Sequence, residues 1–407
     1  MKKYLIISGL IVMFLVSSCS TGKMTQTDQE IIASIKAIEK ELQNVKKEVT
    51  SAKKQDEPDP REKIYRSIKN RPRNMDIKLK HSPPISQGGT GTCWCFSTTA
   101  FLESELVRRG KGYWDLSEMF TVYYEYIEKS TRFIETKGEQ RFGEGGLSHD
   151  VIHVMRKYGA VRETDYDGRM DKNITHNHRA LFNEIMQVIN GAKEYNVWNK
   201  EEILGKIRTV LNKHLGEPPK SINVNGKDVN PVEFVNNVLE IPFDDYIEIT
   251  SYSYMPFFKQ GKLKIADNWM QNDKYYNVPL NDFMEQFKYS IENGYTNAID
   301  YDVSELGNLN NFGYYVVPEE ETQPEDVNQE TREKMYESGK TRDEHLVQIM
   351  GYKGGKDYDW YLVRDSAGAF RSPYRGYAFM RDDYVKLKVL AYMIHKDALM
   401  DKIKSRF

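Results

Sequence analysis

The sequence predicts a fold that contains both helices and strands, and three segments carry this prediction. Residues 94–107 place apolar side chains at helical spacing without an interrupting Gly or Pro, which is typical of a buried helix. Residues 343–352 alternate and then become continuously apolar, which indicates a strand that enters a core. Residues 361–368 indicate a second strand followed by a turn. Because a Gly- and Lys-rich stretch separates the last two segments, we expect them to form a hairpin.

The composition limits the class of protein. The chain has 407 residues, and its 58 Lys and Arg against 60 Asp and Glu give a net charge of −2. This balance excludes a surface built throughout for nucleic acid, which needs a surplus of cations. Hydrophobic residues make up 39% and aromatic residues 12%, enough for a packed core. Three cysteines exclude a disulfide scaffold.

The start of the chain indicates an export signal. An apolar run at positions 4–16 follows two lysines and is too short for a bilayer span, but typical of a secretion signal. Positions 16–19 read VSSC and resemble the lipobox of bacterial lipoproteins. The resemblance implies that residues 1–18 are removed and that Cys19 is diacylated on its sulfur. We expect a lipid-anchored protein of a Gram-negative cell envelope, in the periplasm or at the outer membrane; a plain secretory signal is the alternative.

A helical spacer is expected over residues 19–61. Charged residues and two prolines at 53–61 indicate a linker, so the main domain is predicted to span residues 62–407. The spacer pattern fits either a short coiled coil that makes a homo-oligomer or an amphipathic helix packed on its own domain. It consists of apolar residues separated by alternating steps of four and three, as in a heptad seam: Ile31, Ile35, Ile38, Leu42, Val45 and Val49.

Cys93 stands where a glycine-rich loop becomes the predicted helix. Unpaired N–H groups and the positive end of the helix dipole stabilise a thiolate at such a position. Gln87 lies six residues earlier, where its side-chain amide and the Cys93 N–H can supply the two donors of an oxyanion hole. Cys95, two residues along the helix, faces away from Cys93, so we expect it in the core and not in a disulfide.

Residues 87–97 fit the pattern Q-x-x-x-G-x-C-W-x-F-S, which resembles the active-site signature of papain-like cysteine peptidases. Residues 116–118 resemble the L-S-E segment of that family. Gly145 and Gly146 resemble its glycine pair, whose backbone holds an extended substrate. The resemblance implies peptide substrates and a catalytic histidine far downstream.

His345 fits that position best, because the predicted strand 343–352 would hold its imidazole rigidly. The segment that ends at Asp365 resembles the family's N-S-W-G strand, whose first residue orients the histidine. Cys93 is then expected to be the nucleophile, and His345 its proton acceptor in a thiolate–imidazolium pair. Asp365 would accept the second ring N–H of the histidine, and Gln87 would bind the oxyanion. No metal or other cofactor is expected.

Segments across the rest of the chain resemble the bleomycin hydrolase and aminopeptidase C branch of this family, in the form found among Bacteroidetes. The branch implies an α+β fold with two lobes, a helical lobe carrying Cys93 and a β-barrel-like lobe carrying His345 and Asp365. It also implies hydrolysis from a free amino terminus, although an endopeptidase stays open. The matching segments are 244–246, 249–251, 256–257, 267–269, 277–280, 292–295, 302–305 and 393–399.

The sequence departs from the branch in its tail and in its histidine partner. The tail continues ten residues past Asp397, whereas the family's tail lies in the cleft. Asp365 stands where Asn is usual, and Ala367 where Trp is usual. A missing apolar lid would expose the bond between His345 and Asp365 to water. The rival hypothesis is therefore a catalytically impaired peptide-binding or scaffolding lipoprotein on the same fold.

Overall fold

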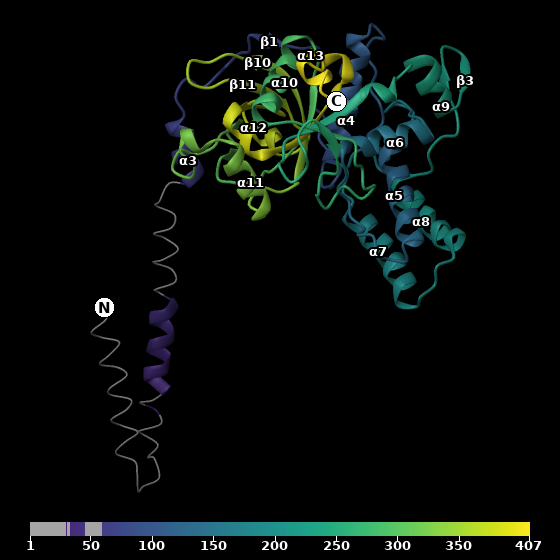
Figure 1. The fold of residues 1–407 in the computed structure, drawn as a ribbon. Coiled ribbons are helices and arrows are strands. Elements are labelled where there is room, and N and C mark those ends of the chain that lie inside the picture. The colour runs from purple at the N-terminus through teal and green to yellow at the C-terminus, as the bar shows by residue number, and fades with distance from the viewer. Residues whose placement is uncertain (1–29, 31–32, 45–58) are drawn as a thin grey trace. The chain divides into compact units, whose positions relative to one another are not determined.

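The computed structural model describes residues 30, 33–44 and 59–407 (Figure 1). These residues fall into two compact units, Met1–Lys63 and Ile64–Phe407. No helix in the described part of the chain is long and apolar enough to cross a membrane.

The first unit contains the described part of the predicted spacer. Residues 33–44 form a helix on which Ile38 and Leu42 are exposed. Exposed apolar side chains at heptad spacing are what an unpaired coiled-coil seam presents. The signal peptide 1–18, Cys19 and the heptad positions Ile31, Val45 and Val49 lie outside the described residues, so those hypotheses stay predictions.

One lobe of the second unit is helical, and polar caps fix where its helices begin. Ser117 accepts the Phe120 N–H at 3.0 Å, and Asn199 accepts the Glu202 N–H at 3.0 Å. The apolar faces of these helices meet in one core. Its elements are α4 (Cys93–Arg108), α5 (Glu118–Glu135), α6 (Ser148–Tyr158), α7 (Arg179–Glu194), α8 (Lys200–Leu215), β2 (Ile222–Val224), β3 (Lys227–Val229), α9 (Pro231–Glu233) and a π-helix at Phe234–Leu239.

The other lobe is an eleven-stranded sheet with the order β5-β6-β4-β13-β7-β10-β11-β12-β9-β8, to which β1 adds by pairing with β10. All pairs are antiparallel except β4–β6 and β9–β12. The strands are β1 (Ile77–Lys78), β4 (Tyr246–Thr250), β5 (Lys259–Gly261), β6 (Tyr275–Asn277), β7 (Asn297–Tyr301), β8 (Asn308–Leu309), β9 (Tyr314–Tyr315), β10 (His345–Lys353), β11 (Trp360–Arg364), β12 (Tyr377–Arg381) and β13 (Val389–His395). The accompanying helices are α3 (Pro60–Ser67), α10 (Leu280–Glu292), α11 (Gln329–Glu337), α12 (Asp382–Lys388) and α13 (Asp401–Lys404).

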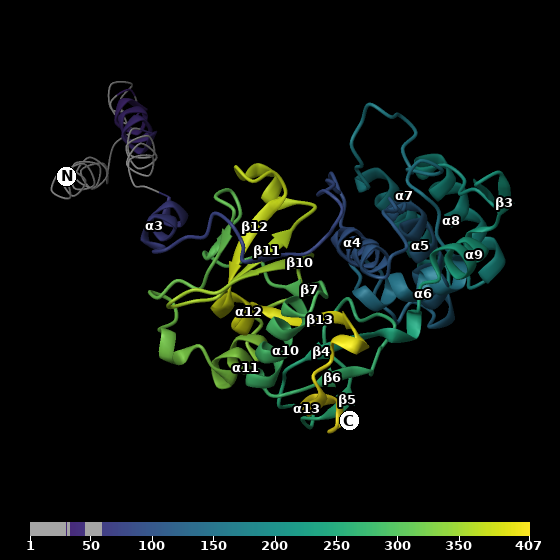
Figure 2. The same cartoon turned by 90° about the horizontal axis from the view of Figure 1, so that it is seen from above.

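Strand β10 joins the two lobes (Figure 2). Leu346 belongs to the core of the helical lobe, whereas Val347 and Ile349 belong to the core under α10. Gln348 faces α4, where it donates to the Ala100 carbonyl at 3.2 Å. Because both faces of the strand are buried, its sequence is almost continuously apolar.

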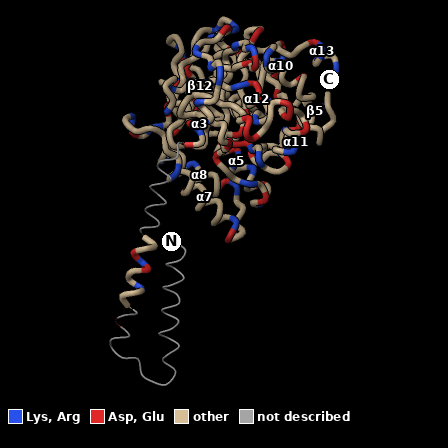
Figure 3. Tube along the Cα trace, turned by 90° about the vertical axis from the view of Figure 1, so that its left-hand side faces the viewer, with Lys and Arg blue, Asp and Glu red and all other residues tan. Residues whose placement is uncertain are grey.

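The α+β prediction is confirmed. The helix expected at 94–107 is α4, and the strands expected at 343–352 and 361–368 are the paired strands β10 and β11. Acidic and basic residues are interspersed along the described chain (Figure 3).

Candidate active site

Cys93 is the first residue of α4 and follows a tightly held glycine loop. Gly88 has a φ of +66°, and a Cβ there would lie 2.4 Å from the His176 carbonyl oxygen, so only glycine fits. The Gly89 N–H donates to the same carbonyl at 2.7 Å. This clamp holds the loop, so the free thiol of Cys93 is fixed at the positive end of the helix dipole.

His345 is the first residue of β10, and Asp365 follows β11, the strand paired with it. The Nε2 of His345 lies 2.8 Å from Asp365 Oδ1. The backbone N–H groups of Ala367 and Ala369 donate to the two oxygens of Asp365 at 2.8 and 2.7 Å. With the carboxylate fixed in this way, the ring is oriented, and the Cys93 thiol lines the same pocket close enough to affect the pKa of the histidine.

The charges of this set favour a protonated histidine. Burial disfavours the imidazolium, but the Asp365 carboxylate and the Cys93 thiolate outweigh it and raise the pKa of His345 to about 10. Burial opposes ionisation of Asp365 as well, but His345 and the two backbone donors lower the pKa of this carboxyl group. Imidazolium and carboxylate are therefore the stable forms at neutral pH.

The missing tryptophan at Ala367 does not open the histidine–aspartate bond to water. Asp365 is 1% exposed and His345 8% exposed. The ring of Tyr301 lies 5.7 Å from the His345 ring and is itself fully buried, so it contributes an apolar wall. Arg364 does not capture the carboxylate, because its guanidinium donates to the Pro83 carbonyl at 2.7 Å.

Replacing Asp365 by Asn is expected to move the alkaline limb of kcat/KM to lower pH. Without the carboxylate charge the pKa of His345 falls, so the imidazolium loses its proton earlier as pH rises. The amide nitrogen would also leave the Ala367 or Ala369 N–H without an acceptor, which costs about 1–3 kcal/mol of stability. A pH–rate profile and a thermal melt measure the two effects. An unchanged alkaline limb would contradict this electrostatic assignment.

Gln87 is held beside Cys93 by contacts at both ends of its amide. Its Nε2 donates to the Thr90 carbonyl at 2.7 Å, and its Oε1 accepts from Ser366 Oγ at 2.7 Å. An amide nitrogen carries two hydrogens, so one remains for a ligand. Because Gln87 lines the same pocket as Cys93, it is placed to donate to an oxyanion formed at the thiol.

Replacing Gln87 by Ala is expected to lower kcat about 10²–10³-fold with little change in KM, because the donor acts on charge that develops in the transition state. Steady-state kinetics with a fluorogenic peptide measure kcat and KM separately. A change in KM alone would contradict an oxyanion role. Gln87→Glu is the size-matched control, since it keeps the acceptor and removes the donor.

The pocket around the thiol has a volume of about 220 Å³. It brings together Gln87, Cys93, His345 and the predicted substrate glycines Gly145 and Gly146, while Asp365 lies behind the histidine. The remaining lining residues are Thr90, Gly91, Asp267, Asp343, Glu344 and Leu346.

Two of these lining residues, Asp267 and Asp343, received no role from the sequence. Asp343 stands two residues before His345, which is a local signal that it lies near the site. Asp267 comes from the loop between β5 and β6, and only the folded structure brings that loop to Gly145.

Other signals in the chain have structural explanations. Cys95 is fully buried and unpaired, as expected. His149 pairs with Glu248 at 2.9 Å and His153 with Glu128 at 3.0 Å. No group of three or more metal-ligating side chains occurs among the residues that the structure describes.

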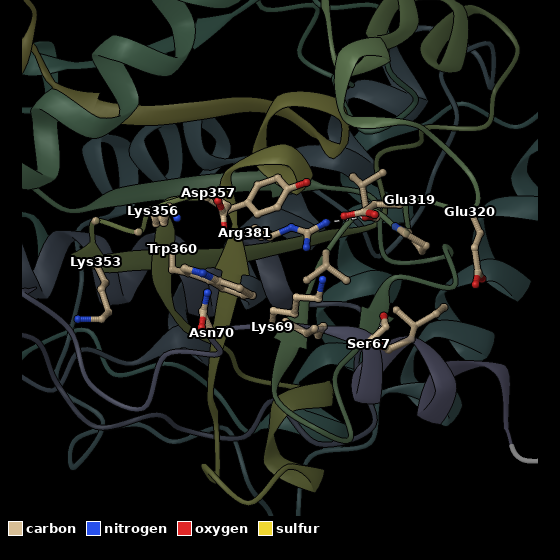
Figure 4. A pocket seen from close by; sticks show the side chains of 18 residues that line it. Ser67, Lys69, Asn70, Glu319, Glu320, Lys353, Lys356, Asp357, Trp360 and Arg381 are labelled. Atoms are coloured by element: carbon tan, nitrogen blue, oxygen red, sulfur yellow. Dashed lines mark hydrogen bonds between the residues drawn. The ribbon is translucent and has the colours of Figure 1, made fainter.

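A second cavity, of about 560 Å³, lies at the turn between β10 and β11 (Figure 4). Lys353, Lys356 and Arg381 line it beside acidic Glu319 and Asp357. No cysteine or histidine lines it, and Arg381 is already engaged by the Val317 carbonyl at 2.6 Å. Its mixed charge and lack of a nucleophile set it apart from the pocket at Cys93.

The fold and the Cys93 pocket define a cysteine-type peptidase with the papain-like arrangement. The chain belongs to the Peptidase C1-like family, whose sequence model matches residues 28–407. The predicted placement in the aminopeptidase C branch is confirmed by its relatives.

Aminopeptidase C of Lactobacillus delbrueckii subsp. lactis is 21% identical, and the match covers 84% of this chain and 87% of that protein. Aminopeptidase G of the same organism is 23% identical over 53% of this chain, which spans only 57% of that relative's length. The crystal structure of pepW from Lactobacillus rhamnosis HN001 superposes with a TM-score of 0.68 at 15% identity and covers 95% of each chain. At that identity the superposition shows the fold.

Proposed function

We propose that the chain hydrolyses peptides by nucleophilic attack of the Cys93 thiolate and acts as an aminopeptidase. The thiolate attacks the scissile carbonyl carbon, and Gln87 with the Cys93 N–H stabilises the oxyanion. The His345 imidazolium gives its proton to the leaving amine, which departs and leaves an acyl-enzyme. His345 then takes a proton from water, and the resulting hydroxide attacks the acyl carbon. The Cys93 thiolate leaves, the acid product is released, and the thiolate–imidazolium pair is restored.

The observation that carries this proposal is the buried contact between His345 and Asp365, at 2.8 Å, next to the free Cys93 thiol. A histidine that is shielded from water and held in one orientation favours an active peptidase. It argues against the rival hypothesis of an impaired binding or scaffolding protein. That rival was motivated by Asp365 and Ala367. Against it stand the hydrogen bond that Asp365 forms with His345 and the buried Tyr301 ring beside the histidine.

The loop between β5 and β6, which lies over one side of the pocket, supports specificity for a free amino terminus. A Cβ on Gly145 would lie 1.8 Å from Asp267 Oδ2, so the β5–β6 loop covers the glycine along which an extended substrate would run. The C-terminal residue packs elsewhere, with the Phe407 ring 4.4 Å from the Tyr276 ring. In this chain the loop, and not the tail, limits the pocket. The relatives named aminopeptidase C and G support the same specificity.

The test compares one fluorogenic peptide with a free and with an acetylated amino terminus, under reducing conditions, on the full chain in detergent. Cleavage of the free peptide alone supports the aminopeptidase. Cleavage of both supports an endopeptidase. Cleavage of neither by a folded protein supports the impaired binding protein.

We also propose that Cys19 carries a lipid that anchors the chain to the cell envelope, and that the heptad residues make a homo-oligomer. The VSSC sequence and the exposed Ile38 and Leu42 support these two proposals. Cys19→Ala should move the protein out of the membrane fraction. Polar substitutions at Ile38 and Leu42 should lower the mass found by analytical ultracentrifugation.

A further inference from the structure

The catalytic pocket has an acidic wall that the mechanism does not use. Asp267 and Asp343 line the pocket with His345 and Gly145. Asp300, on β7, lies behind them and interacts with both carboxylates and with Cys93. Three carboxyl groups thus lie next to a nucleophile that must itself be negative.

None of these three carboxyl groups forms an ion pair with a cation of the described chain. Asp300 is 4% exposed, and the Asp343 carboxyl group is the hydrogen-bonding neighbour of its otherwise unpartnered oxygens. The Oδ2 of Asp343 is also buried without a donor, and the two carboxyl groups face each other. Burial and the nearby Asp267 raise the pKa of Asp343 to about 7, and burial raises that of Asp267. Buried acids without a cation are energetically unfavourable unless a ligand supplies the charge.

Two of the described basic side chains nearby, Lys129 and His149, are engaged with other groups. The Lys129 ammonium donates to the carbonyls of Gly143 and Gly145 and lies 3.5 Å from Glu125. His149 is paired with Glu248 at 2.9 Å. The charges of Lys129 and Arg141 favour the ionised form of Asp267, but neither side chain forms a hydrogen bond with it.

The position of Asp267 indicates which part of a substrate it meets. Its Oδ2 lies against the backbone of Gly145, so the chain of a bound peptide would run into a carboxylate at this point. Phe407 is not part of this wall, because it packs on Tyr276 and Phe258 and does not line the catalytic pocket.

We propose that Asp267 and Asp343, supported by Asp300, form an acidic subsite that binds a cationic group of the peptide substrate beside Cys93. The cation is the free α-ammonium of the substrate or the basic side chain of its first residues. The inference rests on the proposed peptidase function and names the group that this pocket recognises. Asp267 and Asp343 are specificity-determining residues, not participants in bond cleavage.

The test uses Asp267→Asn and Asp343→Asn in the full chain. Asp273→Asn is the matched control, because Asp273 is an exposed acid on the same loop. Four peptides are compared: norleucine or lysine as the first residue, each with a free or an acetylated amino terminus. Neutralising an unpaired buried acid should leave the melting temperature unchanged or higher, so loss of folding does not obscure the result.

Both variants are expected to raise KM at least 10-fold for peptides that carry the recognised cation, with little change in kcat, while Asp273→Asn has no effect. If KM rises only for peptides with a free amino terminus, the recognised group is the α-ammonium. If KM rises only for lysine peptides, the recognised group is the basic side chain. An equal rise in KM for all four peptides, or no rise for any of them, would overturn the proposed subsite.

A binding measurement separates this inference from the proposed function. Calorimetry with the Cys93→Ala chain compares the same four peptides without turnover. If cation-bearing peptides bind at least 10-fold more tightly, and Asp267→Asn removes the difference, the subsite holds even for a protein that shows no hydrolysis. Equal affinities in the Cys93→Ala chain would overturn it.

Discussion

Replacing Cys93 by Ala is expected to lower kcat/KM for peptide hydrolysis at least about 10⁴-fold, because no other group in the pocket can form the acyl-enzyme. Folding should survive, since Cys93 is the first residue of α4 and is not part of a disulfide. The measurement is hydrolysis of a free-amine fluorogenic peptide by the variant at high enzyme concentration.

Cys95→Ala is the matched cysteine control. Cys95 is fully buried, and its Sγ lies 3.4 Å from the Glu118 carbonyl, facing away from the pocket. Its loss should reduce stability by about 1 kcal/mol, the value of a small buried group, and leave kcat unchanged. Residual activity in Cys93→Ala, or loss of activity only in Cys95→Ala, would contradict the assignment of the nucleophile.

Replacing His345 by Ala is expected to lower kcat about 10²–10⁴-fold, since the variant has no proton donor for the leaving amine. It also removes the imidazolium that stabilises the Cys93 thiolate. Alkylation of Cys93 by iodoacetamide should therefore slow at neutral pH and recover as pH rises. An alkylation rate equal to that of the unmodified protein would show that the histidine does not activate the thiol.

The same residue links stability to pH. The pKa of His345 is raised to about 10 in the folded protein from an ordinary value of 6.5. The folded state therefore binds the proton more tightly, so the stabilisation is complete below about pH 6.5 and is lost as pH rises towards 10. His345→Ala should flatten this alkaline part of the stability profile, measured as the free energy of unfolding in denaturant.

The local parts of the site could be predicted from the sequence, because the chemistry sits in short segments. The glycine loop and α4 place Cys93 and Gln87, and the hairpin of β10 and β11 places His345 near Asp365. In each case neighbouring residues determine the geometry.

The distant contributions could not be predicted from patterns. Tyr301 reaches His345 because β7 pairs with β10, and the sheet order is not encoded in any one strand. Asp267 reaches Gly145 by packing of a loop more than a hundred residues away in the chain. Ala367 alone therefore does not reveal how well the bond between His345 and Asp365 is shielded, because Tyr301 comes from another strand.

The most direct test of the central claim is peptide mapping by mass spectrometry after partial alkylation of the full chain with iodoacetamide at neutral pH. The account predicts that Cys93 is labelled before Cys95, that activity falls in proportion to the labelled fraction of Cys93, and that a free-amine peptide slows both. Full activity in a protein whose Cys93 is completely alkylated, or inactivation while Cys93 stays unlabelled, would contradict it.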